Sequence, residues 1–335
     1  MPHEPRQPYL LGLTDTPVEE VFGTEPGLKK ALKRPHFTRQ QQIATLDKLT
    51  ESGTDIGFMA RLLTLCSLPR TNPGSRLQYK RQNGPYKLIM IAGGDNKLPY
   101  GNLPRLLLAW VCTEAVRTKQ RDLTLGRSLA AFMRELGIHS DSGGSRGDRT
   151  RLKNQIDRLF HCQVELIYDT PNHKRSAASR VADATDFWWN YRKPDQQTLW
   201  ESKIRLGEAF YNEIVSNPIP LDMRILREIR RSSLGLDLYM WLSYKSFTLY
   251  RLGRQPEQLQ WEQVYRQFGV DPQKATDKYV LRDFRKDVIR EIAKLKVCWK
   301  GLDVATPRGC LEIRPCPPSV NPKIVDTSPG SVENM

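Results

Sequence analysis

Basic side chains occupy the outer positions of a segment with helical spacing near the end of the chain. Lys278, Arg282, Arg285 and Lys286 avoid the apolar positions there, and between residues 274 and 300 nine Lys or Arg accompany four Asp or Glu. Ammonium and guanidinium groups bind phosphates, and an arginine can also form two hydrogen bonds to a guanine edge. These residues predict a surface that binds and reads duplex DNA, and we take them as the main DNA-binding face.

A second basic group lies in the middle of the chain and shows a weaker pattern. Part of it falls on a predicted helix and part at the tip of a predicted β-hairpin. We expect the helix side chains to contact bases and the tip side chains to contact phosphates. The helix residues are Arg149, Arg151, Lys153, Asn154 and Arg158, and the tip residues are Lys174 and Arg175.

Two alternative interpretations remain beside DNA binding. Any amphipathic helix presents charge to water, so the basic residues also fit a solvated face, although the excess of one sign favours DNA. Trp188, Trp189 and Tyr191 could stack on the bases of a single strand. Aromatic residues at a strand end are more often packed in a core, and we favour that interpretation.

The residues that enzymes acting on nucleic acid need do not occur in a suitable pattern. A phosphate-binding loop ends in Gly-Lys-Ser/Thr, whereas the glycine-rich stretch 143–147 has no lysine and is typical of a flexible turn. Asp283 and Asp287 alternate with basic residues, as in a salt-bridged helix surface. The histidines and cysteines stand singly, without metal-ligand spacing. The sequence therefore predicts a binding protein, not an enzyme, with no metal and no cofactor.

Composition agrees with a DNA partner. The 335 residues include 52 Lys or Arg and 37 Asp or Glu, giving a net charge of +15, and 39% are hydrophobic. This is the composition of a folded soluble protein with a polyanionic partner, for which nucleic acid ranks ahead of a membrane surface. The longest apolar run, Leu103–Val111, is too short to span a membrane. Because the start of the chain also has no secretion signal pattern, we expect a cytosolic protein.

The elements that must position the first-half residues follow one another in a recognisable order. Asn102 and Pro104 begin a helix with an apolar stripe, and a second helix follows Thr124 and ends at Gly137. A third helix starts near Asp148. Extended segments at 163–168 and 180–190, joined by a polar tip at 171–179, form a hairpin, and a stretch at 199–214 completes the sheet.

The same order recurs in the second half. One helix covers 234–249, a second covers 261–268 with apolar residues at i, i+3, i+4 and i+7, and a long third helix spans about 281–295. Residues 296–299 and 310–314 form the closing hairpin. The third helices carry the first basic group and the helix residues of the second.

Helix-turn-helix followed by a hairpin is the order of a winged helix. We therefore predict an α+β protein with two tandem winged-helix domains. The expected divisions are an N-terminal extension at 1–55 with a short helix at 38–50, a first domain at 56–216, a second domain at 217–315, and a disordered tail at 316–335.

Several stretches resemble the plasmid-encoded RepA-type replication initiators, over about residues 56 to 314. The first runs from Leu98-Pro99-Tyr100-Gly101 to Trp110 and is followed by Thr113-Glu114-Ala115. Further matching stretches are 125–137, the turn at 142–144, Pro220-Leu221-Asp222, and 236–242.

The resemblance implies a bacterial, plasmid-associated protein that binds repeated sites, called iterons, in a plasmid origin. It implies local DNA melting, recruitment of the host replication initiator and helicase, copy number control, and a monomer–dimer balance in which the dimer represses its own gene. The first winged helix would serve dimerisation and backbone contact, and the second would read bases. A dimeric transcription repressor without initiator activity is the main alternative. An enzyme such as a primase or nickase with unfamiliar motifs is a third.

Overall fold

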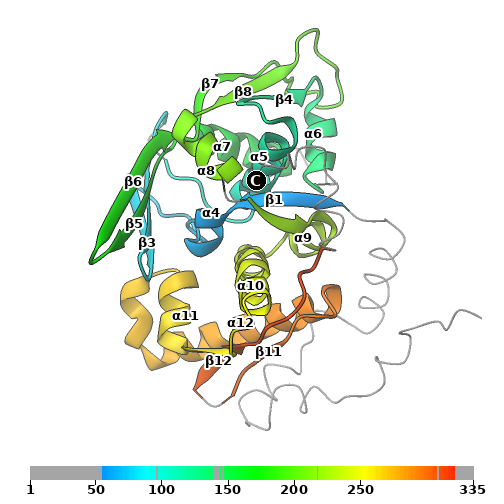
Figure 1. Ribbon diagram of the computed structural model, residues 1–335. Coiled ribbons are helices and arrows are strands. Elements are labelled where there is room, and N and C mark those ends of the chain that lie inside the picture. The colour runs from blue at the N-terminus through cyan, green and yellow to red at the C-terminus, as the bar shows by residue number, and fades with distance from the viewer. Residues whose placement is uncertain are drawn as a thin grey trace, which may run out of the picture.

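The computed structural model describes residues 55–320, apart from 96, 139–143, 145–146, 217 and 308. This part of the chain mixes helices with small antiparallel sheets, and helices of the second half lie below the sheets of the first half (Figure 1). The predicted helix at 38–50 and most of the predicted tail lie outside the described residues. Residues 316–320 do not belong to a loose tail, because Cys316 and Val320 are buried and Ser319 lies 2.8 Å from the Tyr239 hydroxyl.

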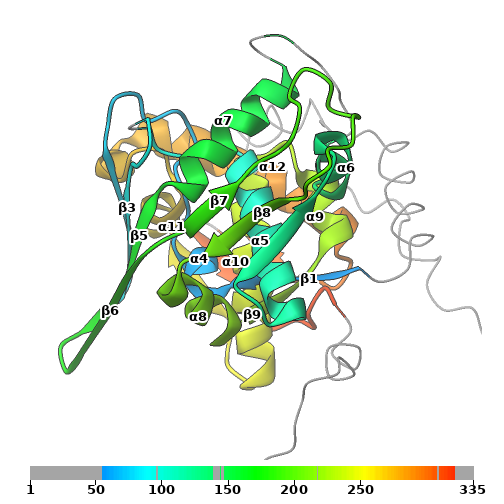
Figure 2. The ribbon, with the colours of Figure 1, turned by 90° about the horizontal axis from the view of Figure 1, so that it is seen from above.

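A four-stranded antiparallel sheet has the strand order β2-β3-β5-β6, and its β5–β6 hairpin projects from the body of the molecule (Figure 2). The strand β3 lies between β2 and β5 in this sheet. We expected a polar loop at 171–179, and this is wrong. From His173 onward the stretch pairs with β5 along its whole length. Its residues are largely exposed, so no apolar alternation marked it as a strand. The strands are β2 (Gln78–Asn83), β3 (Tyr86–Ile91), β5 (Gln163–Thr170) and β6 (His173–Arg180).

The rest of the first half is built on a three-stranded sheet with the order β4-β8-β7. The predicted helices at 103 and 148 are confirmed as α5 and α7. Gly137 follows the helix between them with a positive φ of 74°, as its position predicted. The elements are α5 (Leu103–Thr118), β4 (Asp122–Gly126), α6 (Leu129–Glu135), α7 (Asp148–Phe160), β7 (Ala182–Asp186), β8 (Ser202–Leu206) and α8 (Glu208–Ser216).

Three expectations for this half are wrong. Thr124 does not precede a helix but lies in β4, because Leu123 and Leu125 alternate into the core, and Ser128 caps α6 instead by accepting a hydrogen bond from Ala131 N. The stretch 199–214 is only partly extended, since Phe210 and Ile214 are buried one turn apart on α8. The β5–β6 hairpin pairs with β3, in the sheet that also contains β2, and not with the sheet of β4.

The second half has a three-stranded sheet with the order β10-β12-β11, and its predicted helices are all present. We expected a strand at 296–299, but residues 296–298 are helical. The helix α12 continues to Cys298, and its last turns bury Leu295. The hairpin begins later. The elements are β9 (Pro218–Asp222), α9 (Met223–Ile229), α10 (Ser233–Arg251), β10 (Glu257–Gln260), α11 (Trp261–Phe268), the 3-10 turn η1 (Pro272–Thr276), α12 (Lys278–Cys298), β11 (Val304–Ala305) and β12 (Cys310–Ile313).

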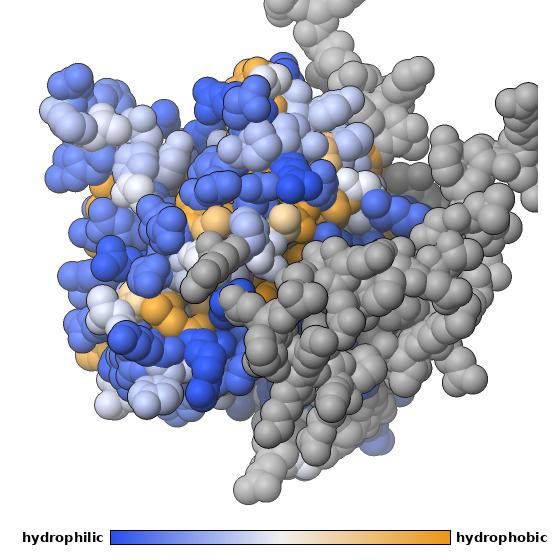
Figure 3. All heavy atoms as spheres, turned by 90° about the horizontal axis from the view of Figure 1, so that it is seen from below, coloured by the Kyte–Doolittle hydropathy of each residue, from blue (hydrophilic) through white to orange (hydrophobic). Residues whose placement is uncertain are grey.

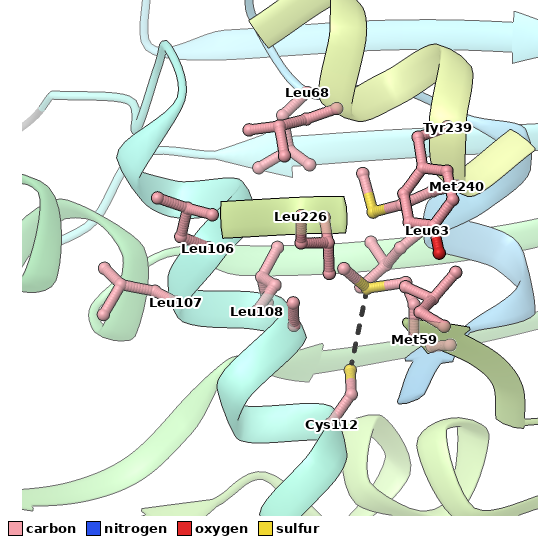
Figure 4. Packing of buried hydrophobic residues seen from close by; sticks show 14 of the residues in the cluster. Met59, Leu63, Leu68, Leu106, Leu107, Leu108, Cys112, Leu226, Tyr239 and Met240 are labelled. Atoms are coloured by element: carbon pink, nitrogen blue, oxygen red, sulfur yellow. Dashed lines mark hydrogen bonds between the residues drawn. The ribbon is translucent and has the colours of Figure 1, made fainter. Parts of the chain in front are cut away.

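A shared core joins the two halves. The strand β1 (Ile56–Ala60) pairs with β9, and the short helix α4 (Arg61–Leu65) follows it. Side chains from β1, α4, α5, α9 and α10 pack together between the halves (Figure 4). Met59 and Cys112, for example, meet with their sulfur atoms 3.8 Å apart. The labelled members of this core are Met59, Leu63, Leu68, Leu106, Leu107, Leu108, Cys112, Leu226, Tyr239 and Met240.

A buried ion pair crosses the same boundary. Arg105 on α5 donates two hydrogen bonds, each 2.7 Å long, to the carboxylate of Asp237 on α10. Both side chains are almost fully buried. The guanidinium also donates to the carbonyls of Leu68, Pro69 and Gly101, so all its donor groups are used. Arg105 therefore fixes α5 against α10.

Candidate nucleic-acid interface

The helix α12 carries a basic stripe of which Lys278 and Arg282 are exposed and Lys286 is half-buried. Its apolar residues point into the second half, where Phe284, Val288 and Ile292 are buried. Lys278, Arg282 and Lys286 follow one another at intervals of four and therefore share another face. The side chain of Arg282 is 59% exposed. The face of the molecule that includes the lower elements of Figure 1 shows mainly hydrophilic residues where it is described (Figure 3).

One acidic residue interrupts this stripe. Asp283 lies 3.2 Å from Arg282 Nε and 3.3 Å from Lys286 Nζ. The hydrogen bonds from these two side chains lower the pKa of Asp283 below its ordinary value, so the carboxylate stays ionised. A DNA phosphate approaching Arg282 or Lys286 would compete with Asp283 for the same donors, whereas no ion pair with Lys278 occurs among the described residues.

Arg285, the fourth predicted residue of this face, has a different environment. It is half-buried, and its guanidinium lies 5.5 Å from the centre of the Trp261 ring at the start of α11. A cation in this position attracts the ring electrons and packs the two helices together. Arg285 thus holds α11 against α12, and Lys278, Arg282 and Lys286 form the stripe.

The predicted residues of α7 are brought together on one helix but are less available. Arg151 is exposed and pairs with Asp148 at 3.2 Å, and Asn154 is also exposed. Lys153 lies over the Tyr191 ring at 4.8 Å. The two half-buried members contact neighbouring loops: Arg149 donates to the Arg192 carbonyl, and Arg158 lies over the Tyr100 ring at 5.2 Å.

Lys174 and Arg175 lie on β6, near the end of the projecting hairpin. Both are exposed, and Lys174 is 3.8 Å from Asp169 on the facing strand. Only residues 171 and 172 connect the strands, so the two basic side chains are held by strand pairing. The hairpin places them apart from α12, in the four-stranded sheet of the first half (Figures 1 and 2).

Two residues near the α12 stripe were missed in the sequence. Tyr279 is 73% exposed, and the Arg282 guanidinium lies 5.5 Å from its ring centre. Arg290 continues the stripe four residues after Lys286 and pairs with Asp287 at 2.6 Å. Extending the four-residue spacing would have found Arg290, whereas an exposed tyrosine inside an amphipathic pattern gives no signal of its own.

The aromatic run at the end of β7 is divided by the structure. Trp189 is buried and stacks on Phe132, with 5.1 Å between ring centres. Trp188 is 48% exposed and lies beside Trp200 on the loop that leads to β8, with 6.3 Å between the rings. The preferred core interpretation therefore holds for Trp189 but not for Trp188.

The cysteines and acidic residues show the chemistry of a packed interior. All six cysteines are free, and five are buried; burial raises the pKa of Cys66 and of Cys112 to about 12, so these thiols stay protonated. Among the residues that the structure describes, no group of three or more His, Cys, Asp or Glu side chains is arranged to hold a metal ion. Within the same residues, no helix is both long and apolar enough to cross a membrane.

Comparison with known families supports the resemblance seen in the sequence. The model of the family described as plasmid encoded RepA protein matches residues 98–263, which begin at the Leu98-Pro99-Tyr100-Gly101 stretch. This match covers 166 of the 335 residues and agrees with the resemblance to plasmid-encoded RepA proteins that the motifs indicate. The matched segment is shorter than the 56–314 that we expected, and it contains α7 but ends before α12.

Two similar solved structures are both of RctB. The structure of selenomethionine derivatives of RctB domains 2 and 3 is 15% identical, with a TM-score of 0.47, and the match covers 78% of this chain and 97% of that one. A second structure of RctB domains 2–3 is 13% identical, with a TM-score of 0.42, and the match covers 75% of this chain and 94% of that one. No curated protein sequence matches the chain.

Proposed function

We propose that the protein is a plasmid replication initiator that binds repeated sites in the plasmid origin and promotes local melting of the DNA. The basic stripe of α12 is the observation that carries this proposal, because it is a row of cations on one face of a helix, in a chain whose residues 98–263 match the RepA family. In this proposal the initiator is cytoplasmic, is not an enzyme, recruits the host replication initiator and helicase, and sets plasmid copy number.

The order of the elements supports two tandem winged helices as the DNA-binding architecture. In the second half a helix, a strand, two helices and two strands follow one another as α10-β10-α11-α12-β11-β12, with η1 between the last two helices. The first half contains the same series, α5-β4-α6-α7-β7-β8, with the strands β5 and β6 inserted between α7 and β7. In each half the last strand of this series lies between the other two. In a winged helix the last helix before the hairpin enters the major groove, a position that α7 and α12 would occupy.

In this proposal the two domains have different roles in DNA binding. The first domain, 56–216, would contact the DNA backbone through the exposed residues of α7 and β6. The second domain, 217–315, would read bases through α12. Arg282 can form two hydrogen bonds to a guanine, whereas lysines such as Lys174 act as point charges toward phosphates.

Self-association has a suitable surface on the first half. Leu199, Trp200 and Trp188 are 87%, 62% and 48% exposed on and next to the β7–β8 loop. Exposed large apolar residues that cluster mark interaction surfaces, and tryptophan is frequent at their energetic centres. A dimer formed here would leave α12 accessible, which fits a form that represses its own gene while the monomer starts replication.

The test is a footprint on the plasmid that carries this gene, combined with permanganate probing of unpaired bases. An initiator protects several directly repeated sites and makes adjacent AT-rich DNA reactive. A dimeric repressor, the alternative function, protects one inverted repeat and opens no DNA. A protein that protects no plasmid sequence would contradict both proposals.

A further inference from the structure

A basic groove lies between the two halves, away from the predicted DNA-binding residues. It has a volume of about 800 Å³ and is formed by β2 and the β2–β3 turn on one side and by α10, β10, α11 and η1 on the other. Lysine and arginine provide five of its lining side chains, and Glu257 is the single acidic one. The basic residues are Lys80, Arg81, Lys87, Lys245 and Arg266.

The charge in this groove is poorly compensated. Glu257 is already paired with Lys245 at 2.8 Å. Lys80, Lys87 and Arg266 have no ion pair with any carboxylate in the described part of the chain. The remaining polar lining consists of amides, among them Gln82, Asn83, Gln263 and Gln273, which donate hydrogen bonds as readily to a phosphate as to water. The groove therefore offers positive charge and neutral donors to an anion.

Arg81 adds a buried charge to the wall. Its side chain is only 1% exposed and forms no ion pair among the described residues. It donates to Tyr79 Oη at 2.7 Å and to the carbonyls of Arg266 and Gly269 at 2.8 Å each. These carbonyls lie at the C-terminal end of α11, where the helix dipole is negative. These acceptors carry no full charge, so the positive charge of Arg81 is only partly offset by the helix end.

The walls are held rigidly together although they come from different halves. Ser67 donates to the Gln267 carbonyl at 2.9 Å, and Gln267 Nε2 donates back to the Leu65 carbonyl at 3.1 Å. Arg70 donates to the Phe268 carbonyl at 3.1 Å. A site whose walls are already fixed loses little freedom when a ligand binds. The groove is thus preformed.

We propose that this groove binds the phosphodiester backbone of a nucleic-acid strand and so adds a contact outside the helices α7 and α12. Lys80, Gln82, Gln263, Arg266 and Gln273 are exposed, so the groove is open to a long ligand. Its cations are distributed over β2, β3, α10 and α11, which suits successive phosphates better than a single phosphate group. This inference rests on the proposed function, because it assumes that the protein binds DNA.

The test compares the salt dependence of DNA binding in three full-length proteins, the unmodified chain and two double variants. The variants are Lys80→Ala with Lys87→Ala in the groove, and Lys97→Ala with Lys203→Ala as a control that removes two exposed lysines elsewhere. The probe is a fluorescent duplex of the plasmid origin, titrated at several salt concentrations. Removing one lysine that binds a phosphate lowers the slope of log K against log salt by about one unit.

We expect the groove variant to lower the slope by about two units and the control to leave it unchanged, with equal melting temperatures for all three proteins. An unchanged slope for the groove variant, while Arg282→Ala still weakens binding, would overturn the groove inference but leave the proposed function intact. Absence of DNA binding by the unmodified protein would instead overturn the proposed function. If inorganic phosphate raises the melting temperature of the unmodified protein but not of the groove variant, and the slopes agree, the groove binds a small phosphate ligand and the strand inference is wrong.

Discussion

The helices α7 and α12 both carry several basic residues, but they differ in how far these side chains are exposed. On α12, Lys278, Arg282 and Lys286 extend along one face, and Asp283 is the main competitor for them. On α7, Arg149 and Arg158 are engaged by neighbouring loops, and Arg151 and Asn154 remain exposed. A basic helix therefore becomes a binding face only where the surrounding chain leaves its cations to solvent.

The helices α7 and α12 belong to different halves of the molecule, and Arg105 is the residue whose loss should disturb the contact between the halves most. Replacing Arg105 with alanine leaves the Asp237 carboxylate buried without its partner. Breaking a buried ion pair in this way costs about 3–5 kcal/mol. We expect the free energy of unfolding, measured by urea denaturation, to fall by that amount. Replacing Arg105 with methionine and Asp237 with leucine together should cost less, and an equal loss would show that the pair itself is not the cause.

Changing the exposed stripe of α12 should have the largest effect on DNA binding. If Arg282 contacts a base, Arg282→Ala should weaken binding to the origin repeat by about 1–3 kcal/mol and relax specificity at one position. Titration of the repeat and of single-base variants measures both quantities. Arg285→Ala is a useful variant for comparison. It should lower the stability of the protein, because it removes the contact between Arg285 and the Trp261 ring. Loss of affinity without loss of stability in that variant would place Arg285 at the DNA instead.

Changes on α7 should have smaller effects that differ within the helix. Arg151→Ala should weaken binding about equally for all sequences and lower the salt slope by about one unit, since we assign it to phosphate. Arg158→Ala should leave the slope unchanged because its guanidinium packs over Tyr100. Titration at several salt concentrations measures the slope for both variants. If Arg158→Ala lowers the slope and Arg151→Ala does not, the distinction between exposed and packed residues of α7 is wrong.

The smallest effect is expected at Asp283. Asp283→Asn frees Arg282 and Lys286 and should raise DNA affinity a few-fold at low salt, with the gain fading as salt screens the charges. Because Arg282 and Lys286 lower the pKa of Asp283, the carboxylate favours the folded state above its ordinary pKa of about 3.8, and this contribution is lost as pH falls through the lowered value. The gain should therefore be the same between about pH 5 and 8. A gain that disappears toward pH 5 would assign the effect to another group.

Much of the fold was predictable because its main helices bury one face. The stripes of α5, α10, α11 and α12 were visible as apolar residues at helical spacing, and Gly137 marked the end of α6. The strand β6 was not, because both of its faces are largely polar, and α9 was missed because its seven residues are too few to show a period. The same spacing predicted the candidate DNA-binding residues of α12. It did not predict which of them are exposed and which are held by neighbouring side chains.

The sequence by itself determined the family resemblance, the two basic helices and the order of the elements around them, because these depend on residue types at short spacing. Tertiary structure alone decided which cations remain available. It buried Arg105 and Arg81, which are chemically identical to Arg282, by placing carbonyls and a carboxylate from distant segments around them. It also formed the groove between β2 and α11, whose walls lie more than 150 residues apart in the chain. The fate of an arginine depends on which acceptors the fold brings to it, and that information lies in long-range packing.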